Sequence, residues 1–145
     1  MSAVMSKHLL ISIISSIAFI LVGVYTPAGA QADRASISVS EDNIHQSVAS
    51  RLRLNPNAVN VAFAGNVVNV SITIASGKRH RQEYTNEASV VEVAVLKEIA
   101  NKQAYKNVHT IRVQYLMQSG SSRPVVLRTV DFRRGPHGMF EKHSS

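Results

Sequence analysis

The sequence predicts an α+β domain in which two amphipathic helices pack on one face of a four- to five-stranded, mainly antiparallel sheet. Two observations predict this fold. Apolar residues recur at helical spacing over 41–54 and 85–103, and each of these stretches is followed by two segments that alternate apolar and polar residues. The order helix, strand, strand therefore occurs twice, and the apolar faces of the strands need the helices to cover them.

A short alternating segment precedes the first helix. Ile37 and Val39 alternate with serines, which predicts a strand over Ala35–Val39. Ser40 can then cap the helix, which ends before Pro56. Its apolar stripe consists of Ile44, Val48 and Leu52.

Two hairpins and a second helix complete the predicted domain. Gly65-Asn66 supplies a two-residue turn between segments 59–63 and 68–74, since glycine tolerates a positive φ. In the second hairpin a strand over 110–117 is followed by the strand Val125–Phe132, where Pro124 allows only an edge or strand-start position. The helix between the hairpins is capped by Thr85 or Asn86 and carries the stripe Ala88, Val91, Val95 and Ile99.

This order resembles two known arrangements. With Ala35–Val39 as a first strand, the order βαββαβ resembles a ferredoxin-like fold with one added strand. The αββ repeat over 44–74 and 90–115 resembles BON domains, small αββαβ modules of bacterial envelopes. Ser71 and Thr73 stand where such domains usually carry a glycine, and Val125–Phe132 is additional to the module. The BON-like resemblance implies binding to phospholipid or another envelope surface.

The first 32 residues have the order of a secretory signal peptide. A basic start with Lys7 precedes an apolar run over 9–25, and A-x-A sites follow that end at Ala30 and Ala32. We predict cleavage after one of these alanines and export to the periplasm or the exterior. The apolar run has about 17 residues, the lower limit for crossing a bilayer. An uncleaved N-terminal anchor is therefore the alternative.

The remaining chain predicts one domain over 33–134 and a flexible tail over 135–145. The whole chain has a net charge of +7, which favours an anionic envelope component such as phospholipid or acidic polysaccharide as the partner. Another envelope protein is the alternative partner. The one tight cluster is the candidate anion-binding segment Lys78, Arg79, His80 and Arg81. Its alternative role is that of a solvated loop that keeps the protein soluble. Nucleic acid is a poor candidate because no aromatic residues alternate with the cluster.

The sequence carries no signature of catalysis or of metal binding. It has no cysteine, no G-x-S-x-G, no glycine-rich phosphate loop and no histidine pair at helical spacing. We therefore predict a non-enzymatic accessory or binding protein of the envelope or exterior, without a cofactor. Two alternatives stay open: an assembly protein that pairs through an exposed edge strand, Val125–Phe132 or Ala35–Val39, and a small hydrolase whose pocket is built from distant residues.

Overall fold

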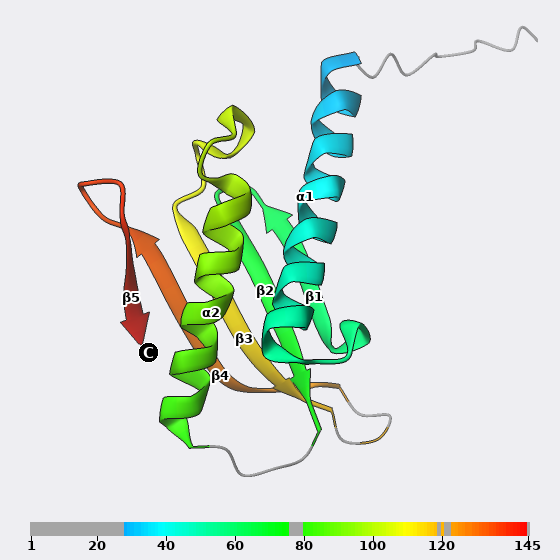
Figure 1. Ribbon diagram of the computed structural model, residues 1–145, viewed down its shortest axis with the longest axis vertical. Helices are drawn as coiled ribbons and strands as arrows, with labels where there is room; N and C mark the ends of the chain where they lie inside the picture. The colour runs from blue at the N-terminus through cyan, green and yellow to red at the C-terminus, as the bar shows by residue number, and fades with distance from the viewer. Residues whose placement is uncertain (1–27, 76–79, 119, 121–122, 145) are drawn as a thin grey trace, which may run out of the picture.

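The computed structural model describes residues 28–75, 80–118, 120 and 123–144. Two helices, α1 (Ala28–Leu52) and α2 (Arg81–Ile99), lie on the same face of a five-stranded sheet (Figure 1). The α+β class and the packing of two helices on a sheet are thereby confirmed. The strands are β1 (Val59–Ala64), β2 (Val67–Ile74), β3 (Thr110–Met117), β4 (Val125–Arg134) and β5 (Phe140–Ser144). Short 3-10 helices, η1 (Pro56–Ala58) and η2 (Gln103–Tyr105), precede β1 and β3.

The sheet is mixed, and its strands follow the order of the chain, β1-β2-β3-β4-β5. The pairs β1–β2, β3–β4 and β4–β5 are antiparallel. β2 and β3 are parallel because α2 returns the chain to the end of the sheet at which β2 begins. The parallel register runs from Val67 opposite Thr110 to Ile74 opposite Met117. The carboxyl ends of β2 and β3 therefore lie at the same end of the molecule.

The core lies between the sheet and the two helices. The apolar stripe predicted for the second helix is confirmed in α2, and Ile44 and Val48 of α1 are completely buried. Every second side chain of β2 and β3 is buried beneath the helices, because successive side chains of a strand point to opposite faces of the sheet. The buried apolar residues of the strands are Val59, Val68, Val70, Ile72, Ile74, Ile111, Val113, Tyr115, Val130 and Phe132.

The predicted strand Ala35–Val39 is wrong, because these residues belong to α1. Alanines at four of the positions 28–35 favour helix. Helical spacing brings Ile37 toward the core and leaves Val39 58% exposed. The Tyr105 hydroxyl donates to the Ser36 carbonyl (3.2 Å), which ties this part of the helix to η2. A run of only four alternating residues fits both a strand and a helix, and the contact with η2 decides in favour of the helix.

The second helix begins earlier than the sequence predicts. Arg81 is its first residue and His80 takes the N-cap position in an extended conformation, without a side-chain cap. Thr85 is instead 9% exposed inside the helix, where its hydroxyl donates to the Arg81 carbonyl (3.2 Å). A side chain able to cap a helix can therefore sit one turn inside it and bond backward.

The expected flexible tail is in part a strand. Gly135-Pro136-His137-Gly138 forms a turn in which the Gly138 amide donates to the Gly135 carbonyl (3.0 Å), and Gly138 has a φ of 78°. β5 then pairs with β4 from Val130 to Arg134. Since β4 lies between β3 and β5, the expectation that Val125–Phe132 forms an outer strand is also wrong for its C-terminal half.

The face of the sheet away from the helices is polar. At its centre the guanidinium of Arg112 donates to both carboxylate oxygens of Asp131, at 2.8 and 2.9 Å. Asp131 is only 5% exposed. These hydrogen bonds hold the pKa of Asp131 below its usual value, and the charges of Arg112, Arg133 and His143 act in the same direction, against the effect of burial.

This shift predicts a pH dependence of stability. The pKa of Asp131 is lower in the folded protein than its unfolded value of about 4. The ionised carboxylate therefore adds to the free energy of unfolding above a pH of about 4, and this contribution is lost as the pH falls through the pKa of the folded state. We expect Asp131→Asn to lower the free energy of unfolding by about 1–2 kcal/mol at pH 7, and by less as the pH drops below about 4. Urea unfolding across this range measures the difference, and a constant difference at every pH would contradict the assignment.

Candidate functional site

Exposed basic side chains from three separate segments gather toward one end of the molecule, which we call the basic end. Two of them lie at the end of α1, two at the start of α2 and one between β3 and β4. All are exposed. They are Arg51, Arg53, His80, Arg81 and Arg123.

The topology explains why these segments converge. α1 ends where β1 begins, and Val59 of β1 pairs with Ile72, two residues before β2 ends. Ile74 pairs with Met117, which pairs in turn with Val125 at the start of β4. The end of α1, the start of α2 and the β3–β4 connection therefore open toward the same end of the sheet (Figure 1).

Few carboxylates oppose this charge. Glu83 is exposed in the first turn of α2, where the helix dipole stabilises it, and Glu87 lies one turn further on. Within the described part of the chain, none of the five basic residues forms an ion pair with a carboxylate, while salt bridges join Lys102 to Glu98 and Arg112 to Asp131 elsewhere. The four exposed arginines at this end produce a local positive field.

Arg53 occupies a backbone conformation that usually belongs to glycine. Its φ is 53°, and it follows the last residue of α1. Its amide donates to the Ser50 carbonyl (3.2 Å) and the Leu54 amide donates to the Ala49 carbonyl (2.9 Å), the two bonds of a Schellman motif. A side chain with a Cβ is strained in this region. A charged residue thus stands where glycine would be more stable.

We expect Arg53→Gly to raise stability and to weaken anion binding. Removing the Cβ relieves strain of about 1 kcal/mol, so the urea midpoint should rise while the affinity for an anionic probe falls. Arg53→Ala is the control, since it removes the charge and keeps the strain. A glycine variant no more stable than the alanine variant would contradict the assignment of strain to this position.

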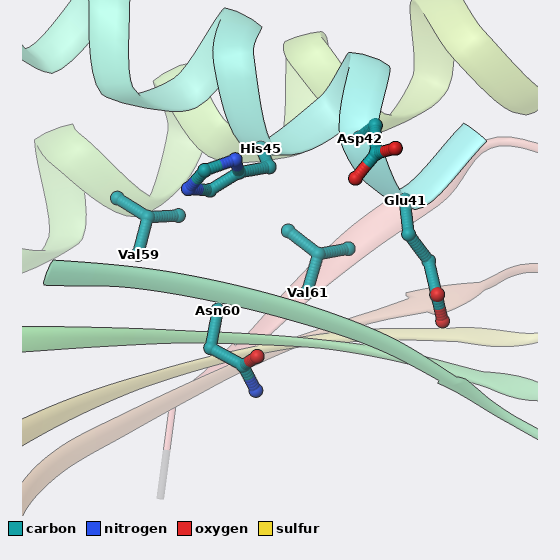
Figure 2. A pocket seen from close by; sticks show the side chains of 6 residues that line it. All are labelled: Glu41, Asp42, His45, Val59, Asn60 and Val61. Carbon is teal, nitrogen blue, oxygen red and sulfur yellow. The ribbon is translucent and has the colours of Figure 1, made fainter. Parts of the chain in front are cut away.

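A small pocket of about 190 Å³ lies between α1 and β1 (Figure 2). His45 and Asp42 approach it from α1, whereas Asn60 points to the other side of β1. The Glu41 carboxylate accepts the Phe63 amide proton (2.9 Å), and His45 Nε2 lies 2.8 Å from the Pro56 carbonyl. The first bond fastens α1 to the edge strand β1, and the second fastens it to η1. Among the described residues, no group of three side chains is arranged to hold a metal ion.

A cavity of about 520 Å³ lies between α2 and the turn that joins β4 to β5. Leu96, Ile99, Met139 and Phe140 supply apolar walls. Glu92 also lines it, and burial raises the pKa of that carboxyl. The guanidinium of Arg134 lies 5.2 Å from the centre of the Phe140 ring and donates to the Lys106 carbonyl. The arrangement has no nucleophile paired with a base, as acyl transfer would require.

The predicted anion-binding segment is only partly described. Lys78 and Arg79 lie outside the described residues, while His80 and Arg81 are exposed at the start of α2. Sequence reasoning missed Arg51, Arg53 and Arg123, because each is separated along the chain from the basic cluster. A sequence signal existed at Arg51 and Arg53, since basic residues near a helix terminus often mark its C-terminal end.

Two further results bear on the protein as a whole. Among the described residues, neither helix is long and apolar enough to cross a membrane. No known protein family and no curated protein matches the chain in sequence.

Proposed function

We propose that the chain is a non-enzymatic binding protein of the cell envelope or exterior that captures an anionic partner through the basic end. The observation that carries the proposal is the convergence of exposed basic residues from α1, α2 and the β3–β4 connection. Lys78 and Arg79 adjoin His80 in the sequence and add to the same charge. The proposed partner carries a cluster of carboxylate or phosphate groups.

The resemblance to BON domains supports an envelope setting. We propose a BON-like αββαβ unit, with β4 and β5 as two additional strands. In this unit the helix, hairpin, helix and strand correspond to α1, β1–β2, α2 and β3. Binding to envelope surfaces is what the resemblance implies for such modules.

We further propose that export removes the leader after Ala30 or Ala32. The contacts described for α1 begin at Ser36, which accepts the Tyr105 hydroxyl, so either cleavage would leave them in place. Intact-mass measurement of protein recovered from the periplasm or medium should give a start at Gln31 or Asp33. An intact Met1 in the membrane fraction would instead support the anchored alternative.

The function is tested by binding at two salt concentrations. The probes are polyglutamate and vesicles with anionic headgroups, with neutral vesicles as the control. We expect binding to the anionic probes at low salt and a steep loss at high salt, because exposed charges are screened over about 10 Å at 0.1 M. The two probes distinguish a carboxylate polymer from a lipid surface. Equal binding to anionic and neutral probes, or binding to neither class, would overturn the proposal.

A further inference from the structure

The N-terminal half of β4 has a partner on one side only. β3 pairs along β4 from Val125 to Arg133, but β5 pairs with β4 only from Val130 to Arg134. The residues 125–129 therefore form an open strand edge in the described part of the chain. Such an edge leaves backbone N–H and C=O groups available for pairing with another extended chain.

The open edge is apolar and exposed. Val125, Val126 and Leu127 are consecutive, with exposed fractions of 55%, 52% and 39%. The register shifts here, since Tyr115 pairs with Arg128 and Leu116 pairs with Val126, which leaves Leu127 without a partner on β3. Natural sheets usually protect open edges with charged residues. Three consecutive exposed apolar residues at an unpaired edge are typical of a surface that another molecule covers.

The positive charge around this edge favours an acidic partner. Arg123 and Arg128 flank the apolar residues, and the sequence from 118 to 130 contains no acidic residue. Arg123 is also part of the basic end. A second copy of this chain would add further arginines to an edge that already carries Arg123 and Arg128, which like-charge repulsion disfavours. An acidic segment would meet complementary charge on both sides of the apolar contact.

We propose that residues 125–129 receive an extended, acidic segment of a partner protein, which adds to β4 as a further strand. Its apolar side chains would pack on Val125, Val126 and Leu127, and its carboxylates would lie near Arg123 and Arg128. This inference rests on the proposed function, because it names the partner of the basic end as a polypeptide. Backbone pairing supplies affinity and the alternating side chains supply specificity.

The test uses protein purified after expression of residues 1–145 and a peptide of alternating valine and glutamate. The matched control peptide has the same sequence with alternate backbone amides N-methylated, which keeps charge and apolar area but removes hydrogen-bond donors. We expect the unmethylated peptide to bind about tenfold or more tightly than the control. Amide exchange at Val125–Thr129 should slow when it binds, while exchange in β2 stays unchanged.

Two variants support the measurement. Replacing Val125, Val126 and Leu127 by threonine keeps strand propensity and removes apolar contact, so peptide affinity should fall about tenfold. Leu127→Pro obstructs edge pairing at the residue that has no β3 partner, where proline is best tolerated. Circular dichroism and retained binding of polyglutamate at low salt establish that each variant is folded.

The outcomes separate the two proposals. Equal binding of both peptides, lost on substitution of the basic end, would overturn strand addition and leave anion capture intact. Binding to anionic vesicles but to neither peptide would also overturn it. Protection of Val125–Thr129 that rises with protein concentration, without peptide, would replace the partner segment by a second copy. Failure to bind any anionic probe would refute the proposed function itself.

Discussion

Replacing Arg51, Arg53, Arg81 and Arg123 by serine is expected to lower the affinity for an anionic probe by about 4- to 900-fold at low salt. An exposed ion pair contributes about 0.2–1 kcal/mol, and four such pairs act together at the basic end. The effect should fall as salt is added, because these side chains are exposed and screened. Polyglutamate binding, measured by fluorescence anisotropy across a salt series, gives both quantities.

A matched variant separates position from net charge. Arg34, Lys97, Lys106 and Lys142 are also exposed, and none of them belongs to the basic end. Replacing these four by serine removes the same charge and is expected to change affinity by less than about threefold. If both quadruple variants bind alike, the partner responds to the total charge of the protein and the basic end is not a site. Replacing Lys78 and Arg79 by serine then measures the contribution of the adjoining segment.

Tyr115→Ala is expected to lower the free energy of unfolding by about 3–5 kcal/mol. Tyr115 is completely buried, and its ring centroid lies 4.7 Å from that of Tyr84. Its hydroxyl donates to the Tyr84 carbonyl (3.0 Å), which joins β3 to the first turn of α2. A loss of this size is a large fraction of the 5–15 kcal/mol typical of a domain. Urea unfolding with linear extrapolation measures it.

Tyr115→Phe is the control for the hydroxyl. It keeps the ring and removes the hydrogen bond to the Tyr84 carbonyl, so a loss of about 0.5–1.5 kcal/mol is expected. Tyr115 also precedes the register shift opposite β4. We therefore expect the alanine variant to speed amide exchange at Arg128 as well as in the first turn of α2. An alanine variant that loses less than about 2 kcal/mol would show that the core repacks around the gap.

The local pattern of the sequence was sufficient for most of the core. Ile44 and Val48 in α1 recur at helical spacing, and Ile111 and Val113 in β3 recur at strand spacing. Each period fixes which side chains share a face, because it follows from backbone geometry within one element. The first turn, Gly65-Asn66, was also predictable, since Gly65 has a φ of 59° that few other residues adopt.

The pattern failed where two interpretations fitted equally well. Residues 35–39 alternate like a strand, yet they belong to α1, where the Ser36 carbonyl accepts the hydroxyl of Tyr105. The sequence predicts a flexible tail over 135–145, although Gly135 and Gly138 form the turn that leads into β5. In both cases the deciding contact is made with a residue remote in sequence or with a neighbouring strand.

The sequence by itself determined the α+β class, the apolar faces of the helices and strands, and the excess of positive charge. Only the tertiary structure decided where that charge lies. Arg51, Arg81 and Arg123 are far apart along the chain, and the parallel pairing of β2 with β3 brings their segments to one end. It likewise decided that β5 pairs with β4 only from Val130 to Arg134, which leaves residues 125–129 as an open edge in the described part of the chain. Periodicity specifies faces within an element, whereas pairing between elements depends on which apolar faces can be buried together.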